Sequence, residues 1–127
     1  MKPIELNQKL ISAFPELTEA YHEQVDWQEG DDTGSHVVYG DVLFPVMRAY
    51  LEGECYSIVQ KYFDFLEALL VTGDDYATDI ITTTVIESLF FDTLDATRVR
   101  PLLGKKTRGI WDNYLGLTHR YSSGGQQ

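Results

Sequence analysis

The stretch that most constrains the fold of this chain runs from Cys55 to Leu70, CYSIVQKYFDFLEALL. Its apolar residues recur at the i, i+3, i+4, i+7 spacing of a helix that buries one broad face. The apolar positions are Cys55, Ile58, Val59, Tyr62, Phe63, Leu66, Leu69 and Leu70. No other segment is as long, as regular and as apolar. We therefore predict that it forms the central helix of a small all-helical domain, with Cys55 as a buried hydrophobic residue.

Amphipathic segments on both sides of this stretch predict an all-α fold. The 127 residues suffice for one domain with its own core. We expect helices over 4–14, 15–27, 42–51, 55–70, 76–91 and 105–121, and a shorter helix or turn-rich connection over 92–103. Connections of about 2–6 residues make neighbouring helices antiparallel. The prediction is six to seven helices in an antiparallel bundle or a short α–α superhelix (HEAT-like), with a single domain over 1–121 and a flexible tail over 122–127.

Two segments conflict with a purely helical interpretation. The run His36–Asp41, HVVYGD, has consecutive apolar residues typical of a strand, but no second strand of matching strength accompanies it. We predict an extended or short-turn segment there, with Asp41 as the N-cap of the next helix and Gly53 closing that helix at C′. The run Ile80–Ile86 is rich in β-branched residues, but its helical period and flanking caps favour a helix.

The charge of the chain is acidic and unevenly distributed. Residues 1–97 hold 4 Lys and Arg against 19 Asp and Glu, which gives −15, and residues 98–127 hold 6 against 1, which gives +5. An acidic surface argues against nucleic-acid binding, because phosphates require positive charge. It favours rapid capture of a basic protein partner, but a generic acidic bacterial surface is the more common meaning of such charge.

No pattern in the sequence predicts catalysis, a cofactor or a metal. The acidic loop Gln28–Ser35 lacks the spacing of a calcium-binding EF-hand, and one His22–Asp26 pair cannot hold a catalytic zinc. We interpret that pair as part of a solvated helix face. No signal peptide and no apolar run of about 20 residues is visible, so we expect a cytoplasmic protein without a membrane span.

The aromatic residues near helix ends say more about a possible binding function than the charged residues do. They are Trp27, Tyr50, Tyr56, Tyr76 and Tyr114, several of them beside acidic residues. Such rings either supply rigid contact area at a protein interface or cover the core with their polar tips in water. The candidate partner-binding residues are Trp27, Glu29, Asp31, Asp32, Asp74, Asp75, Tyr76 and Asp79.

Three motifs carry a resemblance to a known family. Phe14–Leu17 (FPEL), His36–Leu43 (HVVYGDVL) followed by Pro45, and Phe63–Glu67 (FDFLE) are similar to motifs of a family of small acidic all-helical bacterial proteins. That family is a domain of unknown function, its members resemble immunity proteins, and the similarity covers roughly residues 10 to 115. These motifs look structural, so no catalytic residue is carried over from the family.

The resemblance and the acidic charge together favour an immunity protein. It would bind and neutralise a basic toxin domain, in particular a nuclease, of a bacterial competition system such as contact-dependent inhibition, and would be a monomer on its own. The alternatives are a helical adaptor or scaffold that binds a peptide or subunit, and a small metal-dependent enzyme.

Overall fold

The computed structural model describes residues 1–92 and 96–125, with side chains as far as Gly116. Within these ranges every regular element is helical, and the elements join into seven continuous helices and one separate 3-10 turn, η2, which confirms the all-α prediction. In chain order the elements are α1 (Pro3–Ala13), η1 (Pro15–Leu17), α2 (Thr18–Val25), η2 (Gly30–Asp32), α3 (Ser35–Val38), η3 (Tyr39–Leu43), α4 (Phe44–Glu52), α5 (Tyr56–Val71), α6 (Asp75–Ile80), η4 (Ile81–Ile86), α7 (Glu87–Phe91), α8 (Ala96–Val99), η5 (Arg100–Leu102) and α9 (Lys105–Gly125).

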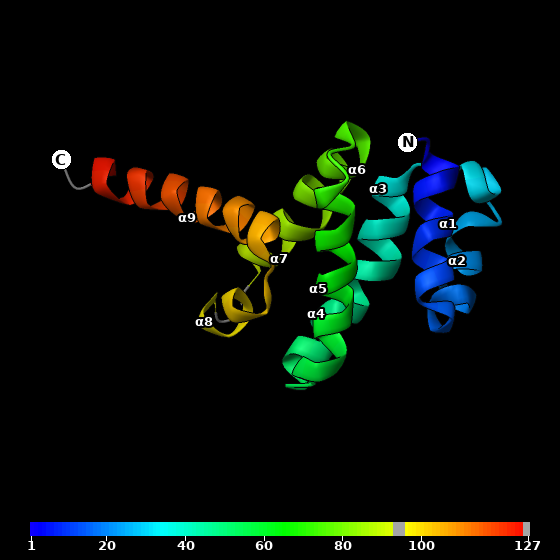
Figure 1. Ribbon diagram of the computed structural model, residues 1–127, viewed down its shortest axis with the longest axis horizontal. Coiled ribbons are helices and arrows are strands. Elements are labelled where there is room, and N and C mark those ends of the chain that lie inside the picture. Colours follow the sequence, from blue (N-terminus) through cyan, green and yellow to red (C-terminus); the bar gives the residue numbers. More distant parts are fainter. Residues whose placement is uncertain (93–95, 126–127) are drawn as a thin grey trace.

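The helix α5 occupies the centre of the molecule (Figure 1). The rod formed by α3, η3 and α4 runs beside it, and α1 and α2 lie beyond that rod at the N-terminal end. The α6–η4–α7 helix lies on the other side, and α9 extends from there away from the body. No helix in the described ranges combines the length and the apolar character needed to cross a membrane.

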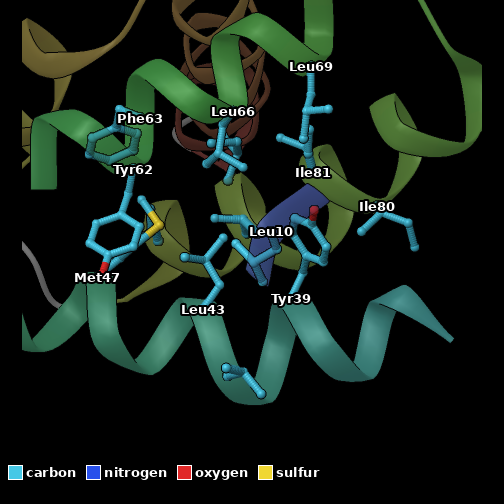
Figure 2. Close-up of a cluster of buried hydrophobic side chains, with 14 of the residues drawn as sticks. Leu10, Tyr39, Leu43, Met47, Tyr62, Phe63, Leu66, Leu69, Ile80 and Ile81 are labelled. Atoms are coloured by element: carbon cyan, nitrogen blue, oxygen red, sulfur yellow. The ribbon is translucent and has the colours of Figure 1, made fainter. Parts of the chain in front are cut away.

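The core lies between α5 and its neighbours (Figure 2). Tyr62, Leu66 and Leu69 project from α5 toward Tyr39, Leu43 and Met47 of the α3–η3–α4 rod, and Leu10 lies between the two helices. Phe63, Ile80 and Ile81 are buried in the same cluster. The Tyr39 hydroxyl donates a hydrogen bond of 2.8 Å to the carbonyl of Leu6, so this buried polar atom is satisfied. The periodicity of the central stretch is thereby confirmed, except at its N-terminal end.

The residues at the start of α5 are less buried than predicted. Cys55 is not inside the helix but is its N-cap residue, and its side chain is only half-buried. Ile58, in the first turn of the helix, is exposed at 39 %. The preceding turn also differs: Gly53 caps α4 with φ −81°, and the residue in the left-handed region is Glu54 with φ 59°.

The predicted extended segment at His36–Asp41 is wrong. A single helical rod runs from Ser35 to Glu52, and Asp41 lies inside its π-helical part instead of capping its start. Pro45 has no N–H to donate to the carbonyl of Asp41, and the Phe44 N–H donates to the carbonyl of Tyr39, five residues back. The wider turn lets the proline fit, and burial of the apolar side chains overrides their preference for a strand.

The predicted helix over the β-branched run Ile80–Ile86 is confirmed, with a π-helical middle. The two π segments, η3 and η4, pack against each other. A Cβ on Gly40 would lie 3.0 Å from the Thr84 methyl carbon, so glycine permits their close approach. The acidic cap predicted before this helix is also present, since Asp74 Oδ2 accepts from the N–H of Ala77 at 2.9 Å.

A carboxylate of the central helix anchors α9. Glu67 Oε1 accepts from the N–H and the hydroxyl of Thr107, and Oε2 accepts from the N–H of Lys106, all at 2.7–2.9 Å. A Cβ on Gly104 would lie 2.5 Å from the Glu67 side chain, so only glycine fits there. Burial would raise the pKa of Glu67, but these hydrogen bonds lower it below its ordinary value of 4.5.

The C-terminal boundaries are partly outside what the structure describes. The helix α9 continues to Gly125, past the predicted end at Tyr121, and residues 126–127 lie outside the described ranges. The predicted flexible tail therefore stays a prediction. In the predicted connection over 92–103, the short α8 and η5 are present and residues 93–95 lie outside the described ranges.

Candidate functional site

The most one-sided charge of the chain lies on α2 and the loop that follows it. Between Lys9 and Arg48 the sequence contains eight acidic residues and no Lys or Arg. Six residues of this segment form what we call the acidic face, and all six are exposed. The acidic face consists of Glu19, Glu23, Asp26, Trp27, Glu29 and Asp32.

The amphipathic pattern of α2 orients this face. Leu17, Tyr21 and Val25 recur four residues apart and are buried, which anchors one side of the helix in the core. Glu19, Glu23 and Asp26 follow the opposite side at i, i+4, i+7 and therefore point to solvent. The fold thus places these three carboxylates on one stripe.

The loop after α2 is fixed to the body by polar contacts. Asn7 Nδ2 on α1 donates to the carbonyls of Asp31 and Thr33 at 3.1 and 2.7 Å, and the Ser35 hydroxyl donates to Asn7 Oδ1 at 2.8 Å. The Tyr21 hydroxyl donates to Asp31 Oδ1 at 2.6 Å, and burial together with this bond raises the pKa of Tyr21. The acidic loop is therefore held in one position beside α2.

Trp27 is the most exposed large apolar side chain of the described residues, at 74 % exposure. An open hollow beside it is lined by Glu19, His22, Glu23, Asp26 and Trp27 itself. Among the described residues, the carboxylates of Glu19 and Glu23 have no ion pair or hydrogen-bond donor, and Asp26 Oδ1 lies 3.1 Å from His22 Nδ1. An exposed indole with unpaired carboxylates around it suits a cationic group.

The other predicted aromatic residues serve the fold. Tyr50, Tyr56, Tyr76 and Tyr114 are half-buried and pack against the core. The Tyr76 hydroxyl accepts a hydrogen bond of 3.1 Å from the N–H of Ser35. Of the two interpretations of these rings, core covering therefore describes the tyrosines, and only Trp27 has the exposure of an interface residue.

The acidic residues predicted around the turn before α6 also fall into two groups, one bonded within the fold and one exposed to solvent. Asp74 caps α6 and lies 2.7 Å from the amino group of Met1, and the hydrogen bond from that group lowers the pKa of Asp74. Asp75 and Asp79 are exposed. Because Tyr76 bonds Ser35 and Asn7 bonds the loop, both predicted acidic regions lie near the start of α1 and α3. Asp31 and Asp74 are thus structural contacts within that region.

Sequence reasoning missed Glu19, Glu23 and Asp26 as candidate partner-binding residues. Acidic residues at this helical spacing are also typical of a solvated helix face, which is the interpretation given above for the His22–Asp26 pair. The signal that could have found them is the absence of any Lys or Arg from Leu10 to Met47. No group of His, Cys, Asp and Glu in the described residues is arranged to hold a metal ion.

Comparison with known families gives one match. The description of the matching family is "Domain of unknown function (DUF7674)", and the match covers residues 7–118, most of the chain. The chain belongs to this family. Comparison with curated proteins and with solved structures gives no match.

Membership of DUF7674 confirms the expectation of a family of unknown function. The match includes the whole acidic face and the core helix α5, so both belong to the family domain. Because the family description assigns no activity, it gives no role to any residue, and the function has to be argued from the chain itself.

Proposed function

We propose that this protein is a non-enzymatic binding protein that captures a basic partner protein on its acidic face. The observation that carries the proposal is the segment between Lys9 and Arg48, whose acidic residues no Lys or Arg of that segment balances. Glu19, Glu23, Glu29 and Asp32 project from it without an ion pair among the described residues. Unpaired carboxylates attract a basic partner over long range and repel nucleic acid.

A toxin domain is the partner that we propose within this class. A nuclease needs a basic cleft for phosphate, so an acidic surface can occupy or border that cleft and block it. The similarity of the motifs quoted above to immunity-protein-like families supports the same direction. In this proposal the protein is a cytoplasmic immunity protein, a monomer on its own, and needs no cofactor.

The direct test compares three double charge reversals of equal net charge in binding to the product of a co-expressed neighbouring gene. Glu23→Lys with Glu29→Lys changes the acidic face, Asp75→Lys with Asp79→Lys changes α6, and Asp41→Lys with Asp64→Lys is the matched control. We expect the first pair to slow association by about tenfold at low salt, with much less effect at high salt. Equally slow association of all three double variants would show that only the net charge of the protein matters. That result would contradict binding of the partner at the acidic face.

A groove between α1 and α5 favours a second candidate function, that of a peptide-binding adaptor. It is lined by Glu5, Gln8, Lys9, Ser12, Ala13, Phe65, Ala68, Leu69 and Thr72. Four of these lining residues, Ala13, Phe65, Ala68 and Leu69, are apolar, and apolar side chains line grooves that accept an amphipathic helix. In this case Ala68→Glu would abolish partner capture, whereas the acidic-face variants would leave it unchanged.

A further inference from the structure

We propose that Trp27 and Glu23 form a receptor for an arginine side chain of the partner, which makes this site selective for arginine over lysine. This inference rests on the proposed capture of a basic partner and names the chemistry that the acidic face recognises. It starts from an exposed helix surface that nothing in the described chain covers, the hollow beside Trp27.

The exposure of Trp27 demands an explanation that the fold does not give. Its indole is 74 % exposed, whereas the other tryptophan, Trp111, is 2 % exposed and packs edge-on against Phe90 at 5.1 Å. Trp27 is not part of the buried core cluster or of the partly buried side chains that pack against it, and no ring contact joins it to another described aromatic residue. An indole in water contributes little to stability, and tryptophan is among the side chains that dominate binding energy at interfaces.

The surroundings of the indole specify a cation. The hollow is lined by Trp27, the carboxylates of Glu19, Glu23 and Asp26, and the imidazole of His22. A cationic group over the indole face gains from the ring quadrupole, and carboxylates at the rim complement its charge. An apolar partner group would instead have to desolvate these carboxylates without pairing them.

The pairing of a flat ring with carboxylates favours a guanidinium group over an ammonium group. Arginine is planar, so it can stack on the indole of Trp27 while its N–H groups donate in the plane to a carboxylate. Glu23 is the best-placed acceptor, because it lies in the last turn of α2, lines the same hollow as Trp27, and its carboxylate has no partner among the described residues. Asp26, next to Trp27, already contacts His22 at 3.1 Å. A lysine ammonium is a compact, strongly hydrated charge and cannot make both contacts in this way.

The test uses three capped peptides of equal length with alternating glycine, in which the other residue is arginine, lysine or neutral citrulline. The chain has two tryptophans and thus two indole N–H resonances, and the buried Trp111 serves as the internal control. We expect the arginine peptide to shift the Trp27 resonance, to leave that of Trp111 in place, and to bind about two- to fivefold more tightly than the lysine peptide.

Matched variants separate this inference from the proposed function. Trp27→Ala should remove the preference for arginine but keep weak, salt-sensitive binding of both cationic peptides, and Glu23→Gln should reduce the preference more than Asp64→Asn. Equal affinity for the arginine and lysine peptides in the unmodified protein would overturn the arginine receptor and leave capture of a basic partner standing. Failure of both cationic peptides and of the co-expressed neighbour to bind would overturn both proposals.

Discussion

The two ends of this molecule use their charged side chains differently. Around α8 and α9 several charges have partners within the fold: Arg98 with Glu54 at 2.7 Å, Arg100 with Asp112 at 2.9 Å, and Glu67 with the first N–H groups of α9. On the acidic face, by contrast, the carboxylates project into water from an already complete core. The paired charges contribute to the fold, whereas the unpaired carboxylates of the acidic face do not, and it is on these that the proposed capture of a basic partner rests.

The two tryptophans give the largest expected contrast between these regions. Trp111→Ala removes a ring that is 2 % exposed, and we expect it to lower the free energy of unfolding by about 3–5 kcal/mol. Trp27→Ala should change it by no more than about 0.5 kcal/mol, because that side chain is exposed. Urea unfolding of both variants measures the difference. A loss of several kcal/mol for Trp27→Ala would mean that the acidic face is part of the core after all.

The cap that Glu67 provides for α9 gives the next largest effect. Glu67→Gln keeps one acceptor oxygen but loses the charge and the second acceptor, so we expect a loss of about 1–2 kcal/mol in the free energy of unfolding. On the acidic face, Glu23→Gln should cause no loss.

The same carboxylate makes stability depend on pH. Since the folded-state pKa of Glu67 lies below 4.5, its contribution is complete above that pH and is lost as the pH falls through the folded-state pKa. Unfolding between pH 6 and pH 3 should therefore show a steeper acid decline in the unmodified protein than in Glu67→Gln. Identical acid declines would show that the cap does not contribute.

Two glycines near the start of α9 form a matched pair. Gly104→Ala would place a Cβ 2.5 Å from Glu67, and we expect a loss of about 1–3 kcal/mol. Gly109 lies within α9 with open space around it, so Gly109→Ala should raise stability by about 0.4–1 kcal/mol. Thermal unfolding of the two variants should move Tm in opposite directions. A shift in the same direction would contradict the close packing of Gly104 on Glu67.

The smallest effect is expected on the acidic face itself. Glu23 lies in the last turn of α2, four residues after Glu19 and three before Asp26, where both neighbours and the helix dipole disfavour a negative charge. Glu23→Gln should therefore raise stability by about 0.2–0.5 kcal/mol at low salt and by less at high salt. Stabilisation of equal size at both salt concentrations would point to a cause other than charge repulsion.

The sequence predicted the fold well where burial followed a simple period. The apolar stripe from Val59 to Leu70 and the N-cap at Asp74 could be recognised, because each is a local pattern that is typical of a single structure, a buried helix face and a helix start. The helix over His36–Asp41 could not be recognised from the sequence, because its valines favour a strand locally. Packing against α1, α2 and η4 stabilises the helical rod instead.

The candidate site was predicted in part for a similar reason. Composition identified Trp27 and the loop after it, but the exposure of a residue depends on which side of a helix the core occupies. Tertiary hydrogen bonds separate Asp31 and Asp74, which bond Tyr21 and the amino group of Met1, from Glu29 and Asp32, and no local pattern predicts those bonds. Equally, no pattern in the sequence shows that Glu67 reaches Thr107, forty residues away.

The measurement that tests the central claim most directly is the rate of association with the co-expressed basic partner, at low and at high salt. It compares the unmodified protein with Glu23→Lys/Glu29→Lys and with the control Asp41→Lys/Asp64→Lys. We predict that the acidic-face pair slows association by about tenfold at low salt, that the control pair has a much smaller effect, and that high salt removes most of the difference. Unchanged association of the acidic-face pair at low salt would contradict capture of the partner on this surface.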